Sequence, residues 1–311
     1  MSLDPRIATF LAEPSGLPAP ATLDAIRAAT ETGLRTLHGP LEDVAWIHNY
    51  TVPGHARQPI RVRAYAPAGA DAAVAQPALV FAHGGGWCLC SLDLYDNPCR
   101  ALANATGRVV LSVDYRLAPE HPFPVPLEDF YAALCWIGEQ ADALGLDRGR
   151  IAVGGDSAGG NLAAAAALLA RDRAGPAIER QLLLYPALDC DFSTASYGEF
   201  AEGYWLTRET MQFCWSTYLP NAEDAVSAYA SPLRAASLAG LPPATVLVSE
   251  YDPLHDEGMA YAQRLREAGV EAHCERLDGI VHACIHMLGL TPHARQLFDL
   301  AGQALQTPQV F

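Results

Sequence analysis

The stretch from Ile151 to Asn161, Ile-Ala-Val-Gly-Gly-Asp-Ser-Ala-Gly-Gly-Asn, constrains the fold more than any other part of the chain. Its first three residues are apolar and predict a buried strand, and the Ala- and Leu-rich run over 162–169 predicts a helix. Ser157 is therefore expected at a sharp strand-to-helix turn, in a G-x-S-x-G pattern whose small residues let backbone segments approach closely. Such a turn presents the serine hydroxyl at the positive end of a helix dipole, as a candidate nucleophile. The alternative is a tight structural turn with an idle serine.

Apolar runs alternate with helical patterns along most of the chain, which predicts an α/β fold with a mostly parallel central sheet and helices on both faces. A Pro-Gly turn joins the first two expected strands into a hairpin. The expected strands cover residues 44–51, 60–65, 77–82, 108–113, 151–153, 180–185, 244–249 and 270–277. The first expected helix is opened by Pro5 and broken by Pro14, Pro18 and Pro20, and the second is capped by Thr22 and covers 23–37. Further helices are expected over 127–144, 162–169, 257–268 and 292–306. A turn is expected over 104–107.

Polar or glycine-rich signals follow several expected strands, at the sheet edge where sites form in parallel folds. A serine nucleophile needs a base, usually histidine, and a carboxylate that orients the histidine. Ser157, Asp252 and His282 follow three of these strands in an order that suits nucleophile, orienting carboxylate and base.

Other assignments of these roles remain open. His282 could be a structural loop histidine, with His286 and His293 as rival bases. Asp252 could cap the following helix, with Asp256 and Glu250 as rival carboxylates.

The sequence His83-Gly84-Gly85-Gly86 follows another strand and suits the binding of a developing oxyanion. Its glycines let backbone N–H groups face a site without a side chain in the way, and the N–H group of Ala158 offers a third donor. The alternative is a phosphate-binding loop, but no Gly-Lys-Ser/Thr sequence follows.

Together these motifs resemble the hormone-sensitive lipase-like family of carboxylesterases (bacterial family IV). The matching segments span roughly residues 77 to 285 and are His83-Gly84-Gly85-Gly86-Trp87, Asp114-Tyr115-Arg116-Leu117-Ala118-Pro119-Glu120, Gly155-Asp156-Ser157-Ala158-Gly159-Gly160-Asn161, Tyr185-Pro186, Tyr251-Asp252-Pro253-Leu254 and His282. The resemblance implies an α/β-hydrolase fold with a helical cap formed by residues 1–45 and 188–231 over a catalytic core formed by 46–187 and 232–311. It implies the catalytic residues Ser157, Asp252 and His282, the oxyanion-hole donors Gly85, Gly86 and Ala158, and the loop-supporting residues His83 and Gly84.

The function expected from this resemblance is hydrolysis of short to medium acyl-chain esters through an acyl-enzyme, without a metal or an organic cofactor. The segment 188–231 lacks strand periodicity and is crowded with aromatic residues, so we expect an insertion of short helices that helps to form an apolar pocket of limited length. The residues expected to line this pocket are Trp87, Tyr204, Trp205 and Phe213. The alternative is that the aromatic residues pack the core of a small lid. The same triad could instead cleave amides, carbamates or lactones. A non-catalytic receptor for a small ligand is disfavoured by the presence of His282.

One departure from the family pattern follows the expected base. The family commonly has Gly-Phe there, whereas this chain has Ala283-Cys284. We expect the change to reshape the pocket, and we expect Cys284 to confer sensitivity to thiol reagents.

Charge and composition limit the kinds of partner that we expect this chain to bind. The net charge of −15 argues against nucleic acid, and no run approaches the ~18 apolar residues that span a bilayer. Without an export signal at its start, the chain is expected to be cytoplasmic, with free thiols at its eight cysteines. The expected partner is a small-molecule ester. The last strand, over 270–277, is expected at a sheet edge where it could pair with a second copy of the chain in a homodimer.

Overall fold

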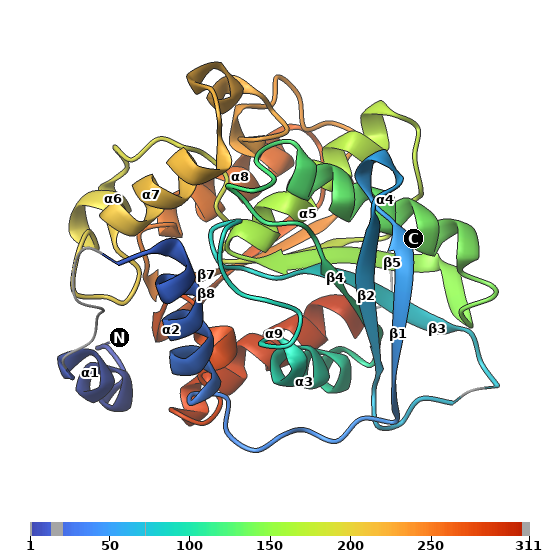
Figure 1. The fold of residues 1–311 in the computed structure, drawn as a ribbon, viewed down its shortest axis with the longest axis horizontal. Helices are drawn as coiled ribbons and strands as arrows, with labels where there is room; N and C mark the ends of the chain where they lie inside the picture. The colour runs from blue at the N-terminus through green and yellow to red at the C-terminus, as the bar shows by residue number, and fades with distance from the viewer. Residues whose placement is uncertain (1, 14–20, 72, 307–311) are drawn as a thin grey trace.

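The computed structural model describes residues 2–13, 21–71 and 73–306, and within these residues eight strands form one sheet (Figure 1). Their order across the sheet is β1-β2-β4-β3-β5-β6-β7-β8. β2 pairs antiparallel with β1 and β4, and the other neighbouring strands pair parallel. The predicted hairpin and mostly parallel sheet are thus confirmed. The strands are β1 Trp46–Pro53, β2 Pro59–Ala66, β3 Gln76–Ala82, β4 Val109–Asp114, β5 Leu146–Asp156, β6 Gln181–Leu184, β7 Ala244–Tyr251 and β8 Ala272–Val281.

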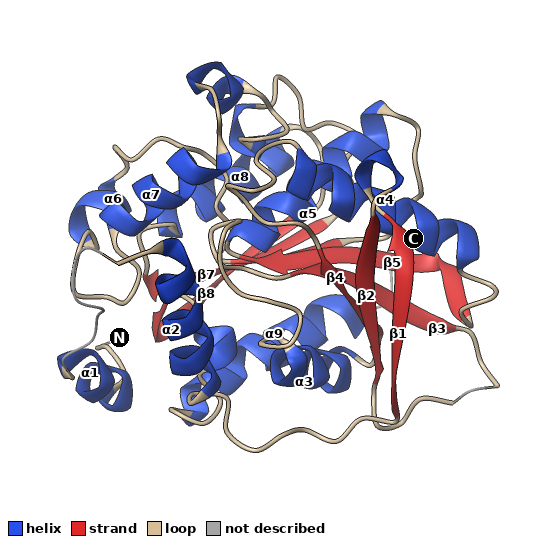
Figure 2. Ribbon diagram, viewed as in Figure 1, coloured by secondary structure: helices blue, strands red, loops and turns tan. Residues whose placement is uncertain are grey.

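Helices cover both faces of the sheet, as predicted (Figure 2). Alternate residues of β3 show why its sequence is a continuous apolar run: Ala78 and Val80 belong to one buried cluster, and Leu79 and Phe81 belong to the other. One face is covered by α4 Val125–Gln140, α5 Ala158–Asp172 and α8 His255–Glu267. The opposite face is covered by α3 Asp96–Thr106 and α9 Arg295–Gln306.

Helix α3 corrects the sequence prediction. The residues 104–107, predicted as a turn, form the end of this helix, and Gly107 closes it with a φ of 65°. The helix begins with Asp-Asn-Pro, which are weak helix formers, although proline is tolerated in a first turn. Its buried residues Cys99 and Leu102 and its packing against α9 stabilise it, and these are tertiary contacts that a local pattern does not report.

The N-terminal segment and the insertion supply further helices. They are α1 Pro5–Ala12, α2 Leu23–Arg35, α6 Ala195–Glu199 and α7 Arg208–Tyr218. Thr22 caps α2 as predicted, because its Oγ1 accepts a hydrogen bond from the N–H group of Ala25. The predicted breaks at Pro14, Pro18 and Pro20 lie outside the described residues. The assignment of these segments to a cap stays a prediction.

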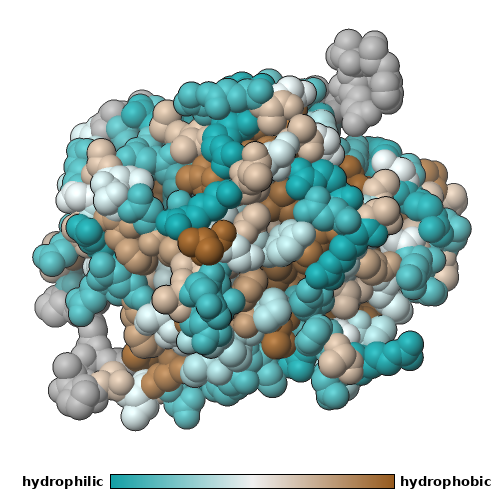
Figure 3. All heavy atoms as spheres, turned by 90° about the horizontal axis from the view of Figure 1, so that it is seen from above, coloured by the Kyte–Doolittle hydropathy of each residue, from teal (hydrophilic) through white to brown (hydrophobic). Residues whose placement is uncertain are grey.

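The surface above the sheet in Figure 1 is mainly hydrophilic toward its rim, with apolar side chains gathered nearer its middle (Figure 3). In the part of the chain that the structure describes, the helices are too short or too polar to cross a bilayer.

Candidate active site

Ser157 occupies the turn between β5 and α5, at the carboxyl edge of the sheet. Its φ of 55° and ψ of −121° are strained for a residue with a side chain, and the surrounding backbone holds them. The N–H group of Ser157 donates to the carbonyl of Leu184, at 2.8 Å. A Cβ atom at Gly159 would overlap the carbonyl oxygen of Ala82, so only glycine allows α5 to begin this close to β3. The predicted strained turn is therefore present.

A chain of hydrogen bonds joins the three residues predicted to be catalytic. The Nε2 atom of His282 lies 2.9 Å from the Oγ atom of Ser157, and its Nδ1 atom lies 2.7 Å from Oδ2 of Asp252. A carboxylate accepts, so Nδ1 of His282 donates to Asp252, which leaves Nε2 to accept the proton of Ser157. All three side chains are buried. Asp252 follows β7 and His282 follows β8, so neighbouring parallel strands bring the two residues together.

The rival residues lie in other contacts. Nδ1 of His293 is 2.9 Å from Asp4, and Oδ2 of Asp256 accepts from the N–H group of Ser196. A carboxylate oxygen of Glu250 accepts from the N–H group of Gly279. Asp252 also accepts from the N–H group of Leu254 through Oδ1, so it orients His282 and closes the following turn at the same time.

The glycine loop after β3 lies beside Ser157 because β3 and β5 are neighbours, with Ala82 opposite Gly155. Gly85 and Gly86 line the same cavity as Ser157, and among the described residues their N–H groups have no protein acceptor. Ala158 is the first residue of α5, where a backbone N–H group has no acceptor within the helix.

His83 supports this loop from behind. Its buried ring donates from Nδ1 to the carbonyl of Gly84, at 2.7 Å, and stacks on Tyr115 with ring centroids 4.4 Å apart. The Tyr115 hydroxyl donates to the His83 carbonyl, at 2.7 Å. Burial lowers the pKa of His83, which favours the neutral ring.

The sequence reasoning missed Asp156. Its Oδ1 atom accepts from the N–H group of Gly84 at 2.8 Å, and its Oδ2 atom accepts from the Tyr95 hydroxyl at 2.9 Å. Burial raises the pKa of Asp156 to about 6, against the opposing effect of these hydrogen bonds. An acidic residue at the end of a buried strand, directly before the candidate nucleophile, was the signal that could have revealed it.

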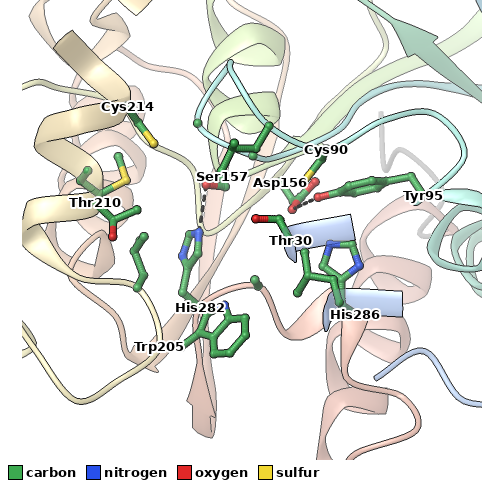
Figure 4. A pocket seen from close by; sticks show the side chains of 17 residues that line it. Thr30, Cys90, Tyr95, Asp156, Ser157, Trp205, Thr210, Cys214, His282 and His286 are labelled. Carbon is green, nitrogen blue, oxygen red and sulfur yellow. Dashed lines mark hydrogen bonds between the residues drawn. The ribbon is translucent and has the colours of Figure 1, made fainter. Parts of the chain in front are cut away.

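A cavity of about 220 Å³ opens beside Ser157 (Figure 4). Part of its wall comes from two helices outside the sheet layers, α2 and α7, together with the residues just before α7. The sequence reasoning did not assign these wall residues, which include Thr30, Leu34, Leu206, Met211 and Cys214.

Four aromatic residues were expected to line the pocket. In the part of the chain that the structure describes, only Trp205 of these four lines this cavity. Trp87 is fully buried and stacks on Tyr218. Tyr204 stacks on Tyr251, with ring centroids 5.4 Å apart. Phe213 is 42% exposed on α7. For this cavity, the expectation for Trp87, Tyr204 and Phe213 is wrong.

The two residues after His282 differ in their position relative to the cavity. Ala283 lines the cavity, whereas Cys284 is fully buried and is not part of its wall. Burial also raises the pKa of the Cys284 thiol, which disfavours the reactive thiolate. Both observations argue against sensitivity to thiol reagents through Cys284.

A serine at a strand-to-helix turn, with histidine and aspartate at later strand ends of a mostly parallel sheet, defines an α/β hydrolase. A family model described as alpha/beta hydrolase fold matches residues 79–286. The carboxylic ester hydrolase LipN of Mycobacterium tuberculosis is 41% identical over 300 residues, which cover 93% of this chain and 78% of that relative. An ethyl acetate hydrolase of Pseudomonas putida is 34% identical, over 98% of this chain and 99% of the relative.

The fold comparison agrees with the sequence comparison. The crystal structure of a thermostable esterase from Pseudomonas putida matches with a TM-score of 0.92 and 35% identity, over 99% of each chain. The chain belongs to this α/β-hydrolase family, in the hormone-sensitive lipase-like group that its motifs resemble.

Proposed function

We propose that this carboxylic ester hydrolase is a serine esterase that cleaves esters of short to medium acyl chains through an acyl-enzyme. The observation that carries the proposal is the continuous hydrogen-bonded chain from Asp252 through His282 to Ser157, with distances of 2.7 and 2.9 Å. A base within hydrogen-bond reach of the hydroxyl, itself oriented by a buried carboxylate, is what activates a serine nucleophile.

The proposed reaction proceeds in two halves. Ser157 attacks the ester carbonyl while Nε2 of His282 takes its proton, and the N–H groups of Gly85, Gly86 and Ala158 bind the oxyanion. The alcohol leaves with the proton from His282. Water, activated by the same histidine, then attacks the acyl-enzyme and releases the acid. Asp252 stays ionised and stabilises the imidazolium during both halves.

The size of the cavity supports a small substrate. Its volume of about 220 Å³ is smaller than the roughly 300–1,000 Å³ of pockets that bury drug-sized ligands. Leu34, Leu206 and Met211 give the wall an apolar character that suits a short alkyl chain. The Pseudomonas putida relative named an ethyl acetate hydrolase is consistent with this range.

The test is hydrolysis of p-nitrophenyl esters of increasing acyl length by the native protein and by Ser157→Ala. We expect the native protein to prefer short chains, and the variant to lose roughly 10⁴-fold or more in kcat/KM, because the nucleophile is removed. Ser216→Ala is the matched control, since Ser216 is an exposed serine of α7 outside the cavity wall and should leave the rate unchanged.

A fluorophosphonate probe gives an independent readout. Labelling confined to Ser157 supports the nucleophile even if the chosen esters are poor substrates. A native protein that hydrolyses none of the esters and is not labelled at Ser157 would refute the proposal.

A further inference from the structure

Helix α7 packs directly on the loop that carries Gly85 and Gly86. A Cβ atom at Gly86 would overlap the sulfur of Cys214 and would lie 2.8 Å from its Cβ atom. The next residue of the loop, Trp87, contacts the next residue of the helix, Trp215, with ring centroids 4.4 Å apart. The loop and the helix are therefore in contact over two consecutive residues of each.

This packing brings two thiols together. Cys88 follows Trp87 on the loop, and its thiol interacts with the thiol of Cys214. Both cysteines are reduced in this structure, and both are at least 97% buried. The interaction with Cys214 lowers the pKa of Cys88, and the guanidinium of Arg27 acts in the same direction; the same interaction, together with burial, raises the pKa of Cys214. Arg27 is fixed there because its Nε donates to the carbonyl of Cys88, at 2.8 Å.

One of the two thiols is open to the substrate cavity. Cys214 lines the cavity with Ser157, and Figure 4 shows its sulfur pointing from α7 toward the loop. A reagent as small as hydrogen peroxide can reach this sulfur by the route that the substrate takes. Cys88 does not line the cavity, so it meets an oxidised Cys214 from the protein side.

We propose that Cys88 and Cys214 are a reversible redox pair, and that their disulfide ties α7 to the glycine loop and slows ester hydrolysis. The effect on hydrolysis rests on the proposed esterase function, whereas formation of the bond does not.

The chemistry balances with hydrogen peroxide as the oxidant. The pair first loses one proton to solvent, and Cys214 reacts in the state in which the remaining proton lies on Cys88. The Cys214 thiolate then takes one oxygen atom of the peroxide; the O–O bond breaks, the departing hydroxide takes the proton of Cys88 and leaves as the first water, and a sulfenic acid remains. The thiolate of Cys88 attacks this sulfur; the S–S bond forms, the S–O bond breaks, and the hydroxide leaves with a proton as the second water. Two thiols lose two electrons and two protons in total, and one peroxide is reduced to two waters. A dithiol reductant reverses the reaction by exchange.

The bond would act on the proposed oxyanion donors. Two sulfur atoms in a disulfide lie closer together than two thiols in contact, so the bond draws the loop toward α7 and moves the N–H groups of Gly85 and Gly86. Displacement of such donors by a fraction of an ångström to 1 Å reduces rates roughly 10- to 100-fold.

The experiment treats the native protein with hydrogen peroxide, alkylates the remaining thiols under denaturing conditions and maps its peptides without reduction. We expect a cross-linked pair of peptides that contain Cys88 and Cys214, and an intact mass lower by two hydrogen atoms. We expect kcat/KM for a short p-nitrophenyl ester to fall roughly 10-fold or more, and dithiothreitol to restore it. Recovery by dithiothreitol distinguishes the disulfide from oxidation of Met211, which also lines the cavity.

Cysteine variants test whether the cross-link and the loss of rate depend on Cys88 and Cys214. Cys88→Ser and Cys214→Ser should each form no such cross-link and show no loss of rate that dithiothreitol reverses. Cys99→Ala, which changes another buried cysteine on α3, should respond as the native protein does.

The possible results test three claims separately: that the disulfide forms, that it slows hydrolysis, and that the protein is an esterase. Free Cys88 and Cys214 after peroxide treatment, a Cys90–Cys214 cross-link, or over-oxidation of Cys214 alone would overturn the redox pair. A Cys88–Cys214 disulfide with unchanged hydrolysis would overturn its effect on the reaction. A native protein that forms the disulfide but, before oxidation, hydrolyses no ester and is not labelled at Ser157 by the fluorophosphonate probe would refute the esterase proposal and leave the redox pair standing. The peptide map of the native protein decides these points even if a variant fails to fold.

Discussion

Asp156 connects the strand that carries Ser157 to the loop that carries Gly85 and Gly86. Its two oxygens hold the N–H group of Gly84 and the hydroxyl of Tyr95, so the loop is fixed at its first glycine. The N–H groups of the next two glycines remain without a protein acceptor among the described residues. A single buried carboxylate thus positions the loop without contacting the reacting atoms of the proposed mechanism.

This carboxylate predicts a particular dependence of stability on pH. Its pKa is raised to about 6 in the folded protein, against about 3.9 in an unfolded chain, so the folded state binds the proton more tightly between these values. The stability that Asp156 contributes is therefore full below pH 4 and is lost as the pH rises through 6, by about 3 kcal/mol in total. We expect the melting temperature of Asp156→Asn, relative to the native protein, to rise between pH 4 and pH 7.

Thermal unfolding of both proteins at each pH measures this difference. Tyr95→Phe is the control, because it keeps the carboxylate and removes a hydrogen bond that lowers the pKa of Asp156, so its stability should fall with rising pH at least as steeply as that of the native protein. Parallel curves for the native protein and Asp156→Asn would contradict the prediction.

The catalytic residues that we propose could be predicted from the sequence, whereas the residues of the cavity wall could not. The strand ends of a parallel sheet meet at one edge, so the sequence alone placed Ser157, Asp252 and His282 near one another. The cavity wall depends instead on how α7 is rotated against the sheet. Phe213 points to solvent while its neighbour Cys214 lines the cavity, and no local pattern distinguishes these two positions.

Helix α2 is tied to the segment after the proposed catalytic histidine. His38, just beyond the end of α2, has its Nε2 atom 2.8 Å from Nδ1 of His286, and the two rings stack. A hydrogen bond between two imidazoles requires that at least one of the facing nitrogens is unprotonated. Burial lowers the pKa of His38 to about 4, aided by the charge of Arg35, and it lowers the pKa of His286 well below its usual value.

We therefore expect acid to loosen α2. A histidine whose pKa is lowered by folding contributes stability that is full above about pH 6.5, its value in the unfolded chain, and that is lost as the pH falls toward 4. The melting temperature of the native protein should fall more steeply between pH 7 and pH 4 than that of His38→Gln. Scanning calorimetry across this range measures the difference, and His273→Gln, at an exposed histidine of β8, should behave as the native protein does. An equally steep fall in His38→Gln would rule out this role.

The elements themselves were largely predictable, because continuous apolar runs mark buried parallel strands and proline or glycine marks their ends. Helix α3 was the exception. Its apolar residues face a partner helix, α9, that lies about two hundred residues further along the chain, so its stability comes from packing rather than from propensity.

At the scale of the whole molecule, β8 leaves one edge of the sheet unpaired among the described strands. The carbonyl of Glu271 accepts from the N–H group of Ala244 next to this strand, so the alternate residues Cys274 and Arg276 direct their backbone groups away from β7. The outward backbone groups of Cys274 and Arg276 leave this part of the edge open to a second copy of the same strand, whereas the carbonyl of Gly279 already accepts from the N–H group of Asp4.

We expect a homodimer with twice the 33.2 kDa mass of the chain, joined through β8. Arg276→Pro removes an outward N–H group and should give a monomer that keeps its fold, since proline is tolerated on an edge strand. Arg276→Ala keeps the N–H group and should remain a dimer. Light scattering after gel filtration measures all three proteins, and a monomeric native protein would exclude this assembly.

Helix α5, which begins directly after Ser157, limits how such a protein can be re-engineered. Every residue from Ala158 to Ala170 is buried, and alanine and glycine make up most of this span. An enlarged side chain there would cost about 1–3 kcal/mol and would displace the serine together with its helix. A mutant library in search of new substrates should therefore leave α5 unchanged and place its diversity at Thr30, Leu34, Leu206 and Met211, where the wall can be reshaped while the nucleophile stays in place.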